Sequence, residues 1–277
     1  MRDIKLVIFD LDGTLLSSKK EILASSLVAI KRLYDNGISV GICSGRIYQM
    51  LEVYVKEIDL KGYVLATNAA SIYQTELNKK IYGKGLHVDS ARKIVEFCLE
   101  NDIDCSLLTD DTCYFSKNSL RIERFKQYNK MAAKKNLKEI PLEHMDSFPV
   151  NIKEIEKVLI YSFDEELLDK SNKFLSTLKD INYNFSEEGL IDISCSDASK
   201  GIGVSKLMKL LDLKPDQVMV FGDYENDISM LDVVKFSVAM GNANSTTKEH
   251  ANFITDTNDN DGIYKAICSI IFMEDVK

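Results

Sequence analysis

The stretch IKLVIF at residues 4–9, followed by DLDGT at residues 10–14, decides how this sequence is interpreted. The first six residues are mostly apolar and rich in β-branched side chains, which is typical of a strand buried on both faces of a sheet. Asp10 and Asp12 stand where this strand ends. Open α/β sheets bind their ligands at the carboxyl ends of their strands, so the two carboxylates are predicted to lie at a binding edge.

Strands and helices alternate on the C-terminal side of this stretch. The expected elements are a helix carrying Leu27, Ile30, Leu33 and Tyr34, a strand at 39–43, a helix that opens after Ser44-Gly45-Arg46, and a strand at 63–67. The same pattern resumes after about residue 191, with a helix at 200–211, strands at 217–221 and 236–239, and a closing helix at 262–272. Such an alternation predicts a parallel sheet that is covered by helices on both faces.

The middle of the chain follows a different pattern. After a hairpin at 71–82, short paired strands are mixed with helices, which favours an α+β insert. We therefore expect an α/β protein with a doubly wound, mostly parallel core. Residues 1–82 and 190–277 would form this core, and residues 83–189 would form an inserted α+β cap domain. Closure of one domain over another completes many active sites, so the cap is expected to move relative to the core.

Composition narrows the class of partners. The 277 residues carry 35 Lys and Arg against 43 Asp and Glu, a formal net charge of −8, which argues against nucleic acid and anionic membranes as partners. Six cysteines without a C-x-x-C pair predict buried free thiols in a reducing compartment. No apolar run is long enough for a signal peptide or a membrane span, so a cytoplasmic location is expected. The oligomeric state stays open.

A second pair of carboxylates follows the strand expected at 217–221. Asp223 and Asp227 flank the start of a helix, where acidic side chains are often only favourable partners of the helix dipole. That simpler interpretation weakens when two buried strands each end in paired carboxylates. Four such groups at one edge would repel one another, and a hard divalent cation with oxygen ligands would relieve the repulsion. Mg²⁺ is the cation that suits a site with one or two carboxylates and a phosphate.

Two further segments predict a place for an anion. Ser44-Gly45-Arg46 opens a helix after the second strand, where free N–H groups and the dipole attract an anion, although Ser44 is equally suited to be a plain helix cap. Lys200 begins the helix that follows the insert. A cation is disfavoured at that end of a helix, which indicates an anionic neighbour.

In this order, the segments resemble the haloacid dehalogenase superfamily of phosphotransferases, and most of all its Cof-type, sugar-phosphatase-like branch with a large α/β cap. The residues that carry the resemblance are Asp10-x-Asp12-Gly13-Thr14, Ser44-Gly45-Arg46, Lys200-Gly201, Gly222-Asp223-x-x-Asn226-Asp227 and Met240-Gly241-Asn242-Ala243. The resemblance extends over nearly the whole chain.

The resemblance implies roles for the four carboxylates. Asp10 would be the nucleophile that forms an aspartyl-phosphate, and Asp12 the general acid and base. Mg²⁺ would bind the Asp10 carboxylate, the Asp12 backbone carbonyl and Asp223, with Asp227 acting near it through water. The charges agree with this arrangement, because a carboxylate can approach a phosphate dianion only when positive charge offsets the repulsion.

The resemblance also implies a phosphate-binding set. Ser44, Gly45, Lys200 and Asn226 would hold the phosphoryl oxygens. Arg46 would either contact substrate or pair with a neighbouring carboxylate.

The resulting interpretation is a Mg²⁺-dependent phosphatase of small phosphorylated metabolites, such as a sugar phosphate or a similar phosphomonoester. Two alternatives stay open. A phosphomutase of the same superfamily would keep the phosphoryl group and return it to the substrate. A non-catalytic protein could bind a phosphometabolite without turnover, although binding alone does not require a second carboxylate two residues from the first. Release of inorganic phosphate separates the phosphatase from both.

Overall fold

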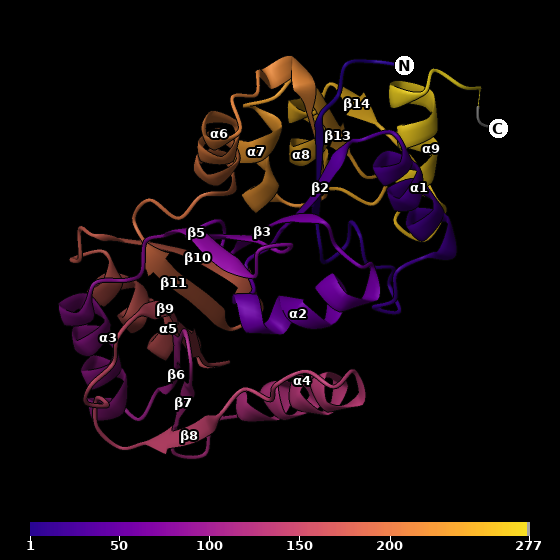
Figure 1. The fold of residues 1–277 in the computed structure, drawn as a ribbon. Coiled ribbons are helices and arrows are strands. Elements are labelled where there is room, and N and C mark those ends of the chain that lie inside the picture. Colours follow the sequence, from indigo (N-terminus) through magenta and orange to yellow (C-terminus); the bar gives the residue numbers. More distant parts are fainter. Residues whose placement is uncertain (276–277) are drawn as a thin grey trace. The chain divides into compact units, whose positions relative to one another are not determined.

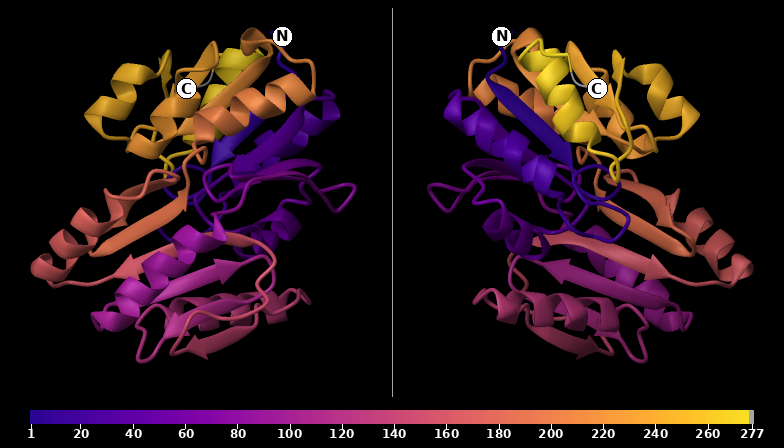
Figure 2. Two further views of the ribbon diagram at one scale, coloured as in Figure 1. Left: turned by 90° about the vertical axis from the view of Figure 1, so that its left-hand side faces the viewer. Right: turned by 90° about the vertical axis from the view of Figure 1, so that its right-hand side faces the viewer.

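The computed structural model describes residues 1–275 (Figure 1 and Figure 2). The chain divides into two compact units. The first consists of Met1–Arg46, Tyr54–Tyr82 and Ser199–Lys277, and the second of Ile47–Val53 and Gly83–Ala198. The second unit is therefore largely an insertion into the first.

The first unit contains an eight-stranded sheet. Its strands are β1 (Leu6–Asp10), β2 (Ser39–Cys43), β3 (Gly62–Ala66), β4 (Ser71–Gln74), β5 (Lys79–Gly83), β12 (Val218–Gly222), β13 (Phe236–Ala239) and β14 (Phe253–Ile254). They are ordered β14-β13-β12-β1-β2-β3-β4-β5. The six strands from β14 to β3 run parallel, and β4 is antiparallel to β3. The predicted mostly parallel sheet is confirmed.

Helices pack on both faces of this sheet. They are α1 (Ala24–Asp35), α6 (Lys200–Leu210), α7 (Ile228–Leu231), α8 (Ser245–His250) and α9 (Gly262–Ala266). Helix α2 (Tyr48–Glu57) is divided between the two units, with its residues from Tyr54 onward in the first. Apolar side chains of α6 and α7 pack against Leu6, Ile8 and Val220 on one face. In Figure 1, α1 and α9 lie together on the opposite side of the strands. The fold is thus doubly wound, and the helix expected at 262–272 is α9 continued by a π-helical turn at Ile267–Ile271.

The register of the central strands brings their carboxyl ends to one level. Asp10, at the end of β1, lies opposite Cys43, at the end of β2. On its other side, Phe9 lies opposite Phe221, so Gly222 ends β12 at the same edge. The residues that follow these three strands therefore emerge side by side.

The second unit contains a six-stranded sheet with helices of its own. Its strands are β6 (Asp104–Thr109), β7 (Cys113–Ser116), β8 (Leu142–Met145), β9 (Ile155–Tyr161), β10 (Ile181–Glu187) and β11 (Leu190–Cys195), in the order β10-β11-β9-β6-β7-β8. The helices are α3 (Val88–Glu100), α4 (Ile122–Lys134) and α5 (Glu165–Leu175). Side chains of α3 and α5 share one hydrophobic core with this sheet, and the Phe97 and Phe174 rings stack with centroids 4.2 Å apart.

The expected boundary at residue 190 differs from this division. Strand β11 pairs antiparallel with both β9 and β10, so it lies in the six-stranded sheet. The chain turns from β10 into β11 through Gly189, whose φ of +74° suits glycine. The division between the units falls between Ala198 and Ser199. The role of the second unit as a mobile cap stays a prediction.

The composition also led to expectations about the cysteines and about membrane-spanning helices, which residues 1–275 allow us to compare with the structure. All six cysteines are buried and free, as predicted. Among these residues, no helix combines the length and the apolar character that crossing a membrane requires.

Close packing of α6 gives a stability prediction. A Cβ atom on Gly203 would lie 2.0 Å from the Ala69 Cβ, which is far inside van der Waals contact. Gly203→Ala is therefore expected to lower the free energy of unfolding by about 1–3 kcal/mol, as overpacking does, although alanine is the better helix former. Ser205→Ala, at an exposed position of the same helix, is the control and should change stability by less than about 0.5 kcal/mol. Urea denaturation measures both, and a Gly203→Ala variant as stable as the control would contradict the packing argument.

Candidate active site

The predicted site residues come from separate elements that meet at one edge of the eight-stranded sheet. Asp10 ends β1, and Asp12 lies in the turn that follows it. Ser44 comes directly after β2, and Asp223 directly after β12. Lys200 is the first residue of α6. Parallel strands direct all their carboxyl ends to one side, which is why residues so distant in sequence lie together here.

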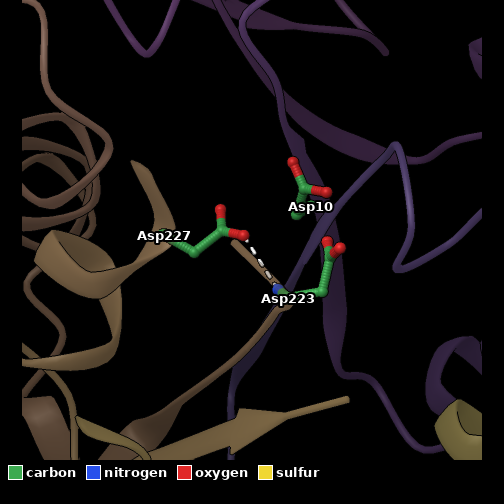
Figure 3. A group of neighbouring side chains, drawn as sticks. All are labelled: Asp10, Asp223 and Asp227. Carbon is green, nitrogen blue, oxygen red and sulfur yellow. Dashed lines mark hydrogen bonds between the residues drawn. The ribbon is translucent and has the colours of Figure 1, made fainter. Parts of the chain in front are cut away.

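Three carboxylates form the centre of this edge. Asp10, Asp223 and Asp227 each offer one oxygen, and these oxygens lie within 4.8 Å of one another (Figure 3). Asp227 Oδ2 accepts hydrogen bonds from the backbone N–H groups of Asp223, at 2.9 Å, and of Tyr224, at 3.0 Å. The Thr14 hydroxyl donates to Asp223 Oδ1 at 3.0 Å. The predicted convergence of these carboxylates is therefore found in the fold.

Lys200 lies between two of these carboxylates. Its Nζ is 2.6 Å from Asp10 Oδ1 and 2.5 Å from Asp227 Oδ1, and its side chain is 1% exposed. Burial by itself would lower the pKa of this ammonium, but the charges of Asp10 and Asp227 outweigh it and hold the pKa above its ordinary value. Lys200 is therefore a permanent positive charge beside Asp10.

One ammonium does not balance three carboxylates. Burial and the charges of Asp227 and Asp223 raise the pKa of Asp10 well above its ordinary value, against the opposing charge of Lys200. Burial and Asp227 likewise raise the pKa of Asp223 to about 6. Burial first, and the neighbouring carboxylates second, thus disfavour the ionised forms of Asp10 and Asp223. A hard divalent cation fits this set of oxygen donors.

The three carboxylates differ in how much they could offer such a cation. Both oxygens of Asp227 already hold partners, Lys200 on Oδ1 and two backbone N–H groups on Oδ2. Asp10 and Asp223 have more acceptor capacity left, since each receives one of the hydrogen bonds described above. Asp10 and Asp223 are thus better suited to direct contact with a cation than Asp227.

Gly13 leaves space for this arrangement. Its φ is +88°, and a Cβ atom there would lie 2.3 Å from Asp223 Oδ2. Any larger residue would strain the backbone and displace the Asp223 carboxylate. The glycine of the DLDGT stretch is therefore required by the site itself.

Asp12 lies outside the carboxylate cluster, in a strongly positive environment. Arg46 Nε donates to its Oδ2 at 2.9 Å, and Arg46 Nη2 donates to its Oδ1 at 2.7 Å. Lys20 Nζ also donates to Oδ1, at 2.9 Å. Burial would raise the pKa of Asp12, but these two cations outweigh it and hold the pKa below its usual value. Of the two expectations for Arg46, pairing with a neighbouring carboxylate is the one observed.

Asn68 connects the residues predicted to hold phosphate. Asn226 Nδ2 donates to Asn68 Oδ1 at 3.4 Å, and the Asn68 backbone N–H donates to the Ser44 carbonyl at 2.9 Å. A Cβ atom on Gly45 would lie 3.3 Å from Asn68 Oδ1, so Gly45 allows a close approach. Ser44, Gly45 and Asn226 are therefore neighbours of one residue, Asn68, which meets Ser44 through its backbone and the other two through its side chain.

Several residues of this region had no role in the sequence argument. Thr14 belongs to the DLDGT stretch, and Asn242, which donates to the Gly13 carbonyl at 2.9 Å, belongs to the last matching segment. Their presence in those segments was the available signal. Asn68 directly follows the strand expected at 63–67, and that position at a strand end was its signal, whereas nothing in the sequence indicated Lys20. Both have positive φ angles, of 52° and 61°, which only the folded backbone reveals.

Solved structures with this fold are known. A haloacid dehalogenase-like hydrolase from Bacteroides thetaiotaomicron superposes with a TM-score of 0.84 at 26% sequence identity, covering 96% of this chain and 99% of that one. A phosphatase of the same superfamily from that organism superposes with a TM-score of 0.78 at 28% identity, covering 95% and 94%.

Curated relatives match over a similar length. The 5-amino-6-(5-phospho-D-ribitylamino)uracil phosphatase YwtE of Bacillus subtilis (strain 168) is 28% identical over 276 residues, covering 94% of this chain and 96% of its own. The phosphatase YwpJ of the same organism is 27% identical over 278 residues, covering 94% and 97%. The family model for haloacid dehalogenase-like hydrolases matches residues 7–267. This chain therefore belongs to the haloacid dehalogenase-like hydrolases.

Proposed function

We propose that this enzyme releases inorganic phosphate from a small phosphorylated metabolite, such as a sugar phosphate, through an aspartyl-phosphate on Asp10 and with the help of Mg²⁺. Its family and relatives make it a phosphatase of phosphorylated substrates. The observation that carries the finer proposal is the buried contact of Asp10 with Lys200, beside two further carboxylates. A buried carboxylate with one ammonium and room for a cation is equipped to attack a phosphoryl group.

The proposed reaction has two steps. In the first, an Asp10 oxygen bonds to phosphorus, the bond from phosphorus to the leaving oxygen breaks, and Asp12, after taking up a proton from solvent or from the phosphate monoanion of the substrate, gives that proton to the leaving oxygen. In the second, water bonds to the same phosphorus, the bond to Asp10 breaks, and Asp12 takes a proton from the water. Covalent catalysis divides one difficult displacement into two easier ones. Lys200 offsets the charge of Asp10 and of the phosphoryl oxygens throughout.

The donor set of this site fits Mg²⁺. The Asp10 and Asp223 carboxylates and the Asp12 backbone carbonyl would hold the ion. Asp227 would not contact the ion directly but would orient Lys200 and the backbone of Asp223. Mg²⁺ would supply positive charge to the phosphoryl oxygens and to the nucleophile. Ser44, Gly45 and Asn226 would bind the remaining phosphoryl oxygens, and this assignment rests on the family resemblance together with their position beside Asn68.

The identity of the substrate is the least specified part of the proposal. The relatives named for 5-amino-6-(5-phospho-D-ribitylamino)uracil support a phosphorylated sugar-like chain as the first compound to test. A panel of sugar phosphates, polyol phosphates, nucleotides and this compound should give inorganic phosphate from at least one member. Phosphoryl transfer between positions without phosphate release would support a phosphomutase instead. Binding without any turnover would support the non-catalytic alternative.

Asp10→Asn is expected to abolish turnover while leaving the fold intact, because the amide keeps the shape of the side chain but cannot act as the nucleophile. The rate of phosphate release should fall by at least about a thousandfold. Asp35→Asn, an exposed change on α1, is the control and should keep full activity. Steady-state assays and thermal melts measure both. Residual activity within tenfold of wild type would remove Asp10 from the mechanism.

Metal dependence gives a separate prediction. Chelator-stripped enzyme should be inactive, and Asp223→Ala should raise the Mg²⁺ concentration for half-maximal activity and lower the maximal rate. Ca²⁺ should substitute poorly, because its larger and looser coordination shell would misalign the attack. Full activity in excess chelator would overturn the metal proposal.

The same proposal predicts a change in stability. Mg²⁺ binds the folded protein, so it should raise the Tm of the wild type and leave the Tm of Asp223→Ala nearly unchanged. A proton on Asp223, whose pKa is about 6, competes with the cation, so the increase should be smaller at pH 5 than at pH 8. Differential scanning fluorimetry with and without Mg²⁺ measures this. An equal Tm increase in both proteins would place the ion elsewhere.

A further inference from the structure

Arg46 holds both oxygens of the Asp12 carboxylate. Its Nε and Nη2 atoms lie 2.9 Å from Oδ2 and 2.7 Å from Oδ1 respectively. This two-point contact matches the planar fork of a guanidinium to the plane of a carboxylate, which fixes direction as well as position. Lys20 adds a single contact, on Oδ1, and its side chain is 60% exposed. Arg46, at 16% exposed, is the more confined of the two partners.

Arg46 is also held in place by a second residue, Tyr54. Its Nη1 donates to the Tyr54 hydroxyl at 3.2 Å, and its guanidinium carbon lies 5.4 Å from the centre of the Tyr54 ring. Tyr54 is buried in the first unit, as part of α2. The guanidinium is thus fixed between a buried aromatic residue and Asp12. By contrast, the Asp12 side chain is 35% exposed and would be free to rotate without this contact.

The contacts leave one position on Asp12 open. A carboxylate has about four lone-pair directions. Among residues 1–275, Oδ1 accepts from Arg46 and from Lys20, whereas Oδ2 accepts only from Arg46 Nε. The remaining acceptor direction is therefore on Oδ2.

We propose that Arg46, supported by Tyr54, is a positioning residue that holds Asp12 so that its Oδ2 atom carries the proton in both steps of the reaction. The inference rests on the proposed function. In the first step the proton passes from Oδ2 to the leaving oxygen as that oxygen separates from phosphorus. In the second step it passes from water to Oδ2 as the water oxygen bonds to phosphorus and the bond to Asp10 breaks. Arg46 acts through Asp12 and not on the substrate.

A substrate whose leaving group needs no proton separates the two steps. p-Nitrophenolate is a stable anion, so its departure from phosphorus does not depend on Asp12. Hydrolysis of the aspartyl-phosphate still does. Loss of Arg46 should therefore slow only the second step with p-nitrophenyl phosphate, and both steps with an alkyl phosphate.

The experiment compares wild type with Arg46→Ala in Mg²⁺-containing buffer by stopped-flow. With p-nitrophenyl phosphate, the variant should release about one p-nitrophenolate per active site in a burst, followed by a steady rate about 30-fold or more below wild type. With the best alkyl phosphate from the substrate panel, it should show no burst, and kcat should fall about 100-fold with KM within about threefold of wild type. Added guanidinium should restore part of the rate, whereas Arg46→Lys should not, because an ammonium lacks the fork.

Two variants complete the design. Arg32→Ala removes a comparable two-point contact, with Glu274, far from the site in the same unit, and should keep kcat and KM. Tyr54→Phe keeps the ring and removes only the hydroxyl donor–acceptor contact, so kcat should fall a few-fold with KM unchanged. If Arg46→Ala does not fold, Tyr54→Phe together with Arg46→Lys carries the test.

The outcomes separate the inference from the function on which it rests. If the wild type releases no phosphate from any compound, the proposed function itself is contradicted. A wild type that is active, with an Arg46→Ala variant that keeps kcat within threefold, overturns the positioning role alone. A rise in KM of tenfold or more at unchanged kcat also overturns it, because Arg46 would then bind substrate directly. A burst with p-nitrophenyl phosphate, a KM for the alkyl phosphate within about threefold of wild type, and recovery by guanidinium support it.

Discussion

The Lys200 ammonium between Asp10 and Asp227 is the interaction on which the rest of the site depends. The buried Asp10 and Asp227 and the half-buried Asp223 would otherwise repel one another at this sheet edge, and a buried charge without a partner is strongly destabilising. Reaching this position requires α6 to approach the neighbouring elements closely. Gly201 and Gly203 make that possible, since a Cβ atom on either would lie about 2 Å from Ser229 or Ala69.

Asp10 and Asp12 are two residues apart and lie in opposite electrostatic environments. Asp10 is buried beside other carboxylates, which raises its pKa. Asp12 lies beside Arg46 and Lys20, which lower its pKa.

The sequence was sufficient for the central strands and for the residues at their ends, because buried parallel strands have continuous apolar runs and polar residues at their exits. It was not sufficient to assign β11 to a sheet. Its residues indicate a strand, but whether a strand joins one sheet or another depends on long-range pairing that apolar patterning does not encode. Asn68 follows the strand expected at 63–67, so its place at this edge was predictable, but its contacts were not. Its contacts with Ser44 and Asn226 depend on a left-handed backbone that no residue type there required.

The division of the first unit into three stretches of chain has a consequence for how the molecule forms. Most of the second unit is one continuous segment, Gly83–Ala198, whereas β1 pairs with β12, and Lys200 meets Asp10 across 190 residues. Domains fold as units, starting from the N-terminus during synthesis, and distant pairings form late because loop closure must come first. Strands β1–β3 and the whole of Gly83–Ala198 are therefore synthesised before β12 is available to pair with β1. The sheet edge that holds the carboxylate cluster is therefore expected to assemble late, and a truncated chain that lacks Ser199–Lys277 would retain most of the second unit but lose Lys200, Asp223 and Asp227.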